Sequence, residues 1–227
     1  MAARLRLGAR WHQAAVMSFL TVSLAGCSVM GDVSSTDTDI VKIGTLLLHS
    51  ITGIGSASEV PRERVAAIPY ASLGVRLGSS DQSLLVLASK NGDNLLWVGG
   101  RSIALTVRAG RIVRTVGFAQ NLSGIETTSG PASGESDHPN YLYDFAEQSR
   151  FGVAVKCSRT DLGHERVVIL GVSHDTDHVA EDCEAAEMDW NFRNEYWSDP
   201  SGFVWKSRQN VAPDLDAFDL EVLRPAE

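Results

Sequence analysis

The feature that most constrains the fold is a succession of short segments, rich in β-branched and aromatic residues, that begins at Tyr70 and continues almost to the end of the chain. Several of these segments alternate apolar and smaller or more polar side chains, as Ile103, Leu105 and Val107 do with their neighbours. A period of two places the apolar side chains on one face of a strand. The pattern therefore predicts a protein built mainly of β-strands.

Tight-turn signals, among them Asn91-Gly92 and Ala109-Gly110, separate many of these segments. Short strands joined by tight turns form hairpins, which makes neighbouring strands antiparallel. No helix-length insert between the segments supports βαβ units. We expect an all-β fold, an antiparallel meander closed as a barrel or folded as a sandwich. Residues 124–140 are polar and rich in glycine and serine, and are expected to form one long loop.

Residues 1–26 have the form of a secretory signal, because a basic start is followed by an apolar core that is too short to cross a bilayer. Small residues precede Cys27, as in a bacterial lipobox, where the cysteine is lipidated and becomes the mature N-terminus. The alternative is an ordinary signal peptide that leaves Cys27 as a stray thiol. Ser28 follows the cysteine in place of an aspartate, which by the usual bacterial sorting rule indicates the outer membrane.

The mature chain is expected to begin with a polar, lipid-anchored tether, residues 27–38, followed by one domain over residues 39–227. This domain should start with a single helix, because apolar residues recur at helical spacing at Ile40, Ile43, Leu47, Ile51 and Ile54. The rest of the domain is expected to be β-rich.

The other two cysteines, Cys157 and Cys183, remain as a pair if Cys27 carries lipid. In an oxidising periplasm such a pair can close a disulfide worth about 3 kcal/mol. The alternative is that Cys157 and Cys183 are two separately buried thiols.

The charge of the chain argues against nucleic acid as a partner. The sequence has 20 basic and 28 acidic side chains, and residues 1–26 hold three of the basic ones, so the mature chain keeps 17 against 28 and a net charge of −11. Binding to nucleic acid depends on neutralising phosphates with Lys and Arg. We therefore expect no nucleic-acid partner, and attachment to a membrane through the N-terminal lipid alone.

A search for catalytic or metal-binding patterns finds no recognised signature. The densest group of potential ligands lies in residues 174–182, which contain His174, His178 and several carboxylates. Imidazole and carboxylate suit zinc, but we expect this segment to be a solvated acidic loop. The sequence accordingly predicts no catalytic residue, no metal site and no cofactor.

Residues 94–125 carry arginines and no acidic residue, in an otherwise acidic protein. Guanidinium groups pair bidentately with carboxylates and phosphates. These side chains are candidates for binding an anionic sugar polymer, a lipid head group or an acidic partner; they are Arg101, Arg108, Arg111 and Arg114. The alternative is a solvated strand face whose arginines answer acidic residues elsewhere in the fold.

Residues 190–206 are expected to form a hairpin rich in aromatic side chains, including Tyr196, Trp197 and Trp205. Flat amphipathic rings are suited to stacking on sugars. Aromatic pairs across strands also stabilise sheets, by roughly 0.2–1 kcal/mol per pair. Both ligand stacking and packing within the sheet are therefore open for these three residues.

The chain resembles the YjbF/GfcB family of bacterial lipoproteins, which is associated with exopolysaccharide and group 4 capsule production. The resemblance rests on the lipobox ending at Cys27 and on three segments: IPYASLGVRLG (68–78), GRIVRTVGF (110–118) and NEYWSDPSGFVWKSRQNVAPD (194–214). It extends from about residue 40 to residue 225. It implies an all-β periplasmic domain tethered to the outer membrane and encoded near polysaccharide export genes, and it supplies no catalytic residues.

Together these observations favour a non-enzymatic accessory factor for exopolysaccharide or capsule production, which contacts the polymer or a protein of the export machinery. One alternative is a periplasmic enzyme that modifies the polymer, for which Glu195 and Asp199 are candidate carboxylates. Another is a structural envelope lipoprotein that binds a protein partner.

Overall fold

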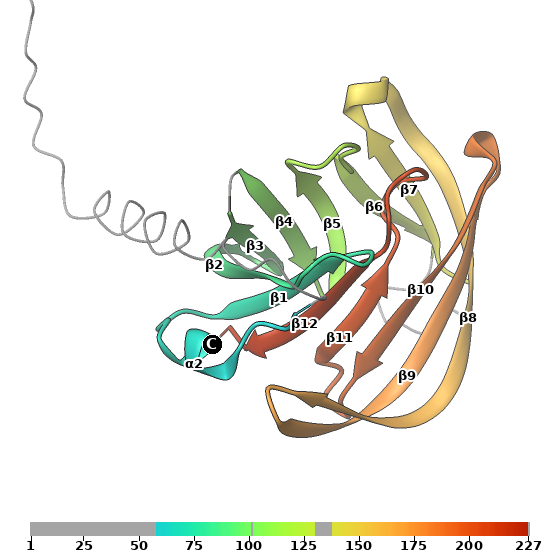
Figure 1. The fold of residues 1–227 in the computed structure, drawn as a ribbon. Coiled ribbons are helices and arrows are strands. Elements are labelled where there is room, and N and C mark those ends of the chain that lie inside the picture. Colours follow the sequence, from blue (N-terminus) through green and yellow to red (C-terminus); the bar gives the residue numbers. More distant parts are fainter. Residues whose placement is uncertain (1–57, 101, 130–137, 227) are drawn as a thin grey trace, which may run out of the picture.

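The computed structural model of the protein describes residues 58–100, 102–129 and 138–226. These residues form one twelve-stranded sheet that curls into a nearly closed barrel, with one short α-helix beside it (Figure 1). In chain order the elements are α2 (Arg62–Ala66), β1 (Ser72–Leu77), β2 (Ser83–Asn91), β3 (Asn94–Gly99), β4 (Ile103–Arg108), β5 (Arg111–Val116), β6 (Gly124–Ser129), β7 (Asn140–Phe145), the 3₁₀ turn η1 (Ala146–Gln148), β8 (Arg150–Ile169), β9 (Val172–Ala185), the 3₁₀ turn η2 (Ala186–Met188), β10 (Trp190–Ser198), β11 (Val204–Gln209) and β12 (Phe218–Arg224).

All strand pairs in the sheet are antiparallel, and every pair but one joins two strands that are consecutive in sequence. The exception joins the two ends of the strand-forming region, because β12 pairs with β1 along Leu73–Leu77. The prediction of an all-β antiparallel meander is confirmed. The pairing of β12 with β1 makes the meander a barrel, since one continuous sheet curls round a single core.

The barrel has a seam where its two edge strands, β5 and β6, meet without forming a ladder. The loop between them fastens one end of the seam: the Thr115 amide donates to the Leu122 carbonyl oxygen over 2.9 Å, and the Leu122 amide donates to Thr115 Oγ1 over 2.9 Å. Leu122 is fully buried, so this end of the seam is anchored in the core.

The interior of the barrel holds the main core, to which most strands contribute alternate side chains. Its centre is aromatic: Tyr143 contacts Phe145, Trp190 and Phe192, with ring centroids 6.2–6.3 Å apart. Strands present apolar side chains to the interior and more polar ones to the outside. In β4, for example, Leu105 is completely buried, whereas Thr106 faces outward. The alternation seen in the sequence is therefore the alternation between core and outer surface.

Helix α2 covers part of the outer surface of β2. Val65 of the helix and Ile68 after it pack on Leu84 and Val86, which form a second small core with Val60. The guanidinium of Arg224, on β12, donates to the carbonyl oxygens of Val65 and Ile68 and so ties the helix to the end of the barrel.

The hairpin of β8 and β9 is longer than the barrel, and Figure 1 shows it curving round the lower end of the molecule. The pairing shifts register between Asp161 and Gly163, an irregularity that bends a strand and increases its twist. Beyond it, the end of the hairpin packs on the outer face of β10, where Val167 and Ile169 form a third small core with Trp197. We call residues 164–178 the folded-over hairpin.

Two expectations about loops are wrong. Residues 124–129 belong to the predicted loop 124–140, but they form strand β6, and Asn140 opens β7. Residues 174–182, expected to be an acidic loop, lie within β9 and pair with both β8 and β10. Both strands are rich in polar residues, so the sequence does not show the apolar alternation that is typical of a strand. They are stabilised by backbone pairing with their neighbours, while their outward side chains contact solvent or other polar groups.

The expected signal peptide, the 27–38 tether, the helix at residues 40–54 and Arg101 lie outside the described residues. The assignment of residues 39–227 to one domain therefore stays a prediction. Within the described part of the chain, no helix combines the length and apolar character needed to cross a bilayer.

Candidate functional site

The four candidate arginines do not share one surface. Arg108 and Arg114 line a groove on the outside of the barrel, whereas the side chain of Arg111 is enclosed by groups from β7, β9 and β10. Arg101 lies outside the described residues. The separation arises at the turn between β4 and β5, where a register shift between Thr106 and Val107 interrupts the simple alternation of the hairpin.

The groove that Arg108 and Arg114 line runs over the outer faces of β3, β4 and β5 and reaches the start of β6, and we call it the outer groove. Its volume is about 460 Å³. Hydroxyl and amide side chains dominate its polar lining, which includes Ser89, Asn91, Asn94, Thr106 and Ser123. The groove therefore offers uncharged hydrogen-bonding groups beside two cations, and no acidic side chain lines it within the described part of the chain.

The two arginines of the outer groove differ in the contacts that they make with the rest of the protein. Arg108 donates through Nη2 to the carbonyl oxygen of Ile125, 3.2 Å away, and so links β4 to β6 across the seam. Arg114 is exposed and forms no ion pair with any described residue. Arg114 is consequently the charge in this groove that is freest to meet an anionic ligand.

Arg111 is the centre of a buried polar cluster, which we call the Arg111 cluster. Its Nη2 atom lies 2.6 Å from Oε2 of Glu181 and 2.9 Å from the hydroxyl of Tyr141. Its guanidinium also lies over two rings, 4.4 Å from the centroid of Tyr141 and 5.1 Å from that of Tyr196. These contacts offset the charge of Arg111 inside the barrel through Nη2 and the two rings, so Arg111 is positioned to stabilise the fold. Its Nη1 atom is buried and has no hydrogen-bond partner among the described residues.

Burial and charge set the pKa values in the Arg111 cluster. Burial by itself disfavours the charged guanidinium, but attraction to Tyr196, which carries a charge only at high pH, and to Glu181 raises the pKa of Arg111 overall. Burial raises the pKa of Tyr143 to about 12, and it also raises the pKa values of Tyr141 and Tyr196, although Arg111 acts against it in each case. All three tyrosines are therefore neutral at physiological pH, and the ion pair is the cluster's charged element.

The backbone of the turn before Arg111 is fixed by a side chain from the other end of the sequence. Gln209 of β11 accepts a hydrogen bond from the Ile112 amide over 2.9 Å and donates to the Gly110 carbonyl oxygen over 2.8 Å. Gln209 is buried. It thereby holds the β4–β5 turn against β11 and aims Arg111 at its partners.

The predicted aromatic hairpin exists, as β10 and β11, but its rings meet other side chains of the protein. Tyr196 belongs to the Arg111 cluster. Trp197 stacks on His178 at 4.2 Å between centroids, and Trp205 stacks on His174 at 3.8 Å. The imidazoles come from the folded-over hairpin.

Hydrogen bonds also engage the polar edges of the two tryptophans. Trp197 donates through Nε1 to Glu165 over 2.8 Å, and Trp205 donates to Asp199 over 2.9 Å. Only 7% of Trp197 is exposed. These contacts favour a packing role for Trp197. They also leave little of its ring surface exposed for stacking on a sugar.

The carboxylates considered for an enzyme each have partners within the protein. Asp199 accepts hydrogen bonds from the amides of Ser201 and Phe203 and from Ser201 Oγ, and the Ser201 hydroxyl is the main reason why the pKa of Asp199 is lowered. Glu195 lies 3.3 Å from Arg193 and 3.9 Å from His178. Asp199 thus organises the β10–β11 turn, and Glu195 belongs to a surface network.

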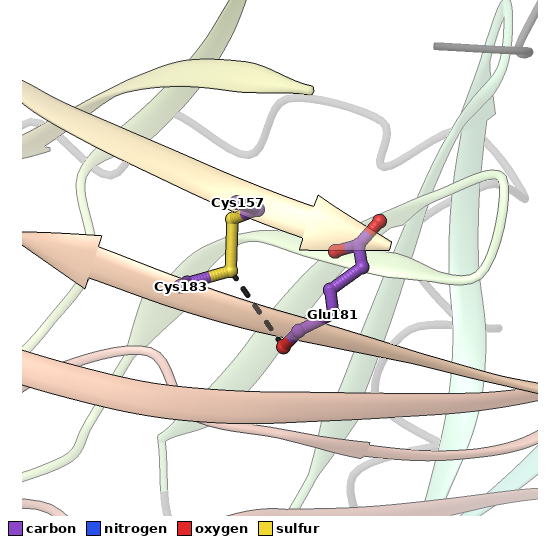
Figure 2. Close-up of side chains that lie close together, drawn as sticks. All are labelled: Cys157, Glu181 and Cys183. Atoms are coloured by element: carbon purple, nitrogen blue, oxygen red, sulfur yellow. Dashed lines mark hydrogen bonds between the residues drawn. A yellow bond between two sulfur atoms is a disulfide. The ribbon is translucent and has the colours of Figure 1, made fainter. Parts of the chain in front are cut away.

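One group of potential metal ligands lies close together in the described part of the chain: Cys157, Cys183 and Glu181 (Figure 2). Cys157 and Cys183 are directly opposite each other on β8 and β9 and form a disulfide, which settles the open choice between a disulfide and two thiols. Metal ions bind thiolates, which a disulfide does not offer. Because the Glu181 carboxylate is also paired with Arg111, this group fits a structural cross-link better than a metal site.

Sequence reasoning considered the carboxylate of Glu181 only as a possible metal ligand and did not connect it with Arg111. It missed Tyr141 and Gln209, which also position Arg111, and the polar residues of the outer groove. For the groove a signal was present. The tight turn at Ala109-Gly110 pairs β4 with β5, so Thr106 lies opposite Arg114. No local signal links Arg111 to β9 or β11, because those contacts join strands distant in the sequence.

The fold and these surfaces define a class: a small antiparallel barrel with a disulfide in its wall, a buried ion pair inside and an open cationic groove outside. The family described as group 4 capsule polysaccharide lipoprotein GfcB/YjbF matches residues 37–223, and the chain belongs to this family. The family is one of lipoproteins associated with capsule polysaccharide.

A sequence relative and a solved structure, both from Escherichia coli K12, support this placement. The chain is 24% identical over 176 residues to the uncharacterized lipoprotein GfcB, a match that covers 74% of this chain and 82% of the relative. The crystal structure of the hypothetical lipoprotein YmcC matches with a TM-score of 0.63 at 19% identity, and covers 86% of this chain and 97% of that one. At that identity the second match shows the shared fold.

Proposed function

We propose that this protein is a non-enzymatic accessory factor in exopolysaccharide or capsule production, anchored by lipid to the outer membrane and facing the periplasm. Its barrel binds an anionic stretch of the polymer in the outer groove. Arg114 and Arg108 supply charge, and the hydroxyl and amide groups beside them hydrogen-bond to sugar hydroxyls. The export machinery would be the protein partner that delivers or receives the polymer.

The observation that carries this proposal is the outer groove itself. Arg114 is exposed and without an ion pair among the described residues, next to Thr106 on the adjacent strand and in a protein whose mature charge is strongly negative. Charge-assisted hydrogen bonds from guanidinium to carboxylate or phosphate are about twice as strong as neutral ones. A polymer carrying acidic sugars or acidic substituents would meet complementary charge here and repulsion over much of the remaining surface.

The cellular placement rests on Cys27 and on the family. The lipobox pattern before Cys27 predicts lipidation, and the GfcB and YmcC relatives are both named as lipoproteins. Ser28 favours the outer membrane over the inner one. Feeding cells with labelled palmitate tests this: the label should appear on the wild-type protein and be absent from Cys27→Ser. A wild-type protein that stays unlabelled would contradict the anchor.

The binding role is tested with Arg108→Ala and Arg114→Ala, singly and together. In cells that carry the double variant as the only copy, secreted polymer should fall, and the affinity of the purified protein for the polymer should fall about ten-fold or more, the size expected for loss of charge-assisted contacts. Arg166→Ala is the matched control, because Arg166 is an exposed arginine that lines no part of the outer groove.

The same purified protein separates the accessory role from an enzymatic one. Incubation with the polymer should leave chain length and substitution unchanged by size-exclusion chromatography and mass spectrometry. Shortening of the polymer would replace this proposal with the enzyme alternative. Normal polymer output and unchanged affinity in the Arg108→Ala/Arg114→Ala variant would exclude the outer groove.

A further inference from the structure

A second hollow lies at one end of the barrel, and we call it the mouth pocket. The turns β2–β3, β4–β5 and β10–β11 converge there, at Gly92, Gly110 and Gly202. Its volume is about 290 Å³. The end of β12 also contributes, through Val222, so the pocket lies where strands from both halves of the chain meet.

The lining of the mouth pocket is mainly apolar and belongs to the core. Leu73 and Trp97 are each 3% exposed and Val107 is 7% exposed, and all three line the pocket. At its rim, Phe203 keeps 37% of its surface exposed. A pocket with an apolar floor and an exposed aromatic rim suits an apolar ligand better than a sugar.

Trp97 supplies an independent observation. Its indole Nε1 is buried and has no hydrogen-bond partner among the described residues. A buried donor without an acceptor is unfavourable, and such groups mark places where a ligand or a water completes the structure. Among the residues that the structure describes, Trp97 alone both lines this pocket and carries an unpartnered buried donor.

We propose that the mouth pocket binds a single acyl chain through its carbonyl or carboxylate end and the methylenes next to it. The apolar floor takes the methylene groups, the Trp97 N–H donates to the acyl oxygen, and Lys90 at the rim faces an anionic head group. Lys90 is exposed and forms no ion pair within the described part of the chain, although Asp93 lies on the same rim. The volume lies at the small end of ligand pockets, which span about 300–1,000 Å³, and so fits one chain better than two.

This inference does not depend on the proposed function. The outer groove and the mouth pocket share no lining residue, because they use opposite faces of the same strands: Leu96 and Thr106 face the groove, while Trp97 and Val107 face the pocket. A variant in one can therefore leave the other intact, and each proposal can fail alone.

The test uses the full chain in isolated cell envelopes and a photoactivatable dodecanoate, with labelled peptides mapped by mass spectrometry. Label is expected on peptides that contain Leu73, Val107 or Val222 and should be displaced by ordinary dodecanoate. Val222→Phe fills the pocket and should lower labelling by about ten-fold or more. Trp97→Phe keeps the ring but removes the donor and should lower it by roughly three- to ten-fold.

Lys90→Glu is the surface variant that keeps the test decisive if either core variant misfolds, and it should lower labelling by about three-fold. Arg114→Ala, in the outer groove, should label as the wild type does. Equal labelling of wild type and Cys27→Ser would identify free lipid as the source of the chain, whereas stronger labelling of Cys27→Ser would identify the protein's own N-terminal lipid. Label that maps elsewhere, or wild-type labelling of a folded Val222→Phe, overturns the proposal.

Discussion

Arg111 and Arg114 lie three positions apart on β5, and the structure gives them opposite environments. Arg111 is surrounded by Glu181, Tyr141 and Tyr196 inside the barrel, and Arg114 stands in the open groove outside it. A buried charge must be neutralised by its surroundings, while an exposed charge is solvated and remains available. The comparison shows that one run of arginines holds both a buried charge, which contacts the inside of the fold, and an exposed charge, which is available to a ligand. Substitutions along this run should therefore separate into two classes.

The largest effect on stability is expected from breaking the buried pair. Glu181→Leu leaves the guanidinium of Arg111 buried without its carboxylate, and should lower the free energy of unfolding by about 3–5 kcal/mol. Arg111→Met combined with Glu181→Leu removes both charges and should restore much of that loss. Denaturant unfolding followed by circular dichroism measures both.

An exposed pair provides the control for this experiment. Arg166 and Asp175 are 2.8 Å apart, and their side chains are 67% and 80% exposed. Removing Arg166 should change the free energy of unfolding by at most about 1 kcal/mol. If Arg166→Ala and Glu181→Leu proved equally destabilising, the distinction between buried and exposed arginines would lose its basis.

The next largest effect on stability is expected from removing the disulfide, which lies in the barrel wall beside the Arg111 cluster. Cys157 and Cys183 are 26 residues apart in sequence, and a disulfide closing a loop of that size stabilises by about 3.5 kcal/mol when reckoned from chain entropy. Cys157→Ala/Cys183→Ala should therefore unfold at a lower denaturant concentration than the wild type. Adding a reductant should shift the wild-type transition toward that of the variant and leave the variant's own transition in place.

Alkaline pH should lower the stability of the fold through the buried tyrosines inside the barrel. The pKa of Tyr143 is raised to about 12, so between pH 10 and 12 the unfolded chain loses this proton while the folded chain keeps it. The unfolded state then binds fewer protons, and stability falls as pH rises across that window, by on the order of 2 kcal/mol. Tyr143→Phe should show a smaller fall over the same pH range in unfolding experiments.

The smallest effect on stability is expected at Arg114. Because the side chain is exposed and unpaired within the described chain, Arg114→Ala should change the free energy of unfolding by no more than about 0.5 kcal/mol. Its affinity for the polymer should nevertheless fall, and the difference from wild type should shrink as salt is added. A loss of stability comparable with that of Glu181→Leu would show that Arg114 is part of the fold.

The sequence predicted the fold class well because the controlling signal is local. Period-two alternation and tight turns such as Asn91-Gly92 set the strands and their antiparallel order one hairpin at a time. The strands β6 and β9 escaped detection because their segments are polar, so only pairing with neighbours reveals them. The pairing of Cys157 with Cys183 was foreseen as one of two alternatives from their number alone.

The sequence named arginines and aromatic residues as candidates for binding, but it did not show how the fold arranges them. Arg108 and Arg114 do share a groove, but Arg111 does not join them, and the ring of Trp197 is covered by His178. Each of these departures involves a contact between residues far apart in sequence, as between Arg111 and Glu181. Such contacts depend on how the sheet curls, which no short window of sequence contains.

The sequence by itself determined that this chain forms a largely antiparallel β protein, with arginines on two adjacent strands and a cysteine pair available for a cross-link. Only the tertiary structure decided which arginine is inside and which is outside, that β12 closes the barrel on β1, and that the folded-over hairpin covers Trp197. The physical reason is that alternation fixes the two faces of each strand locally. The closure of the sheet and the bend of the long hairpin then decide which of those faces becomes core.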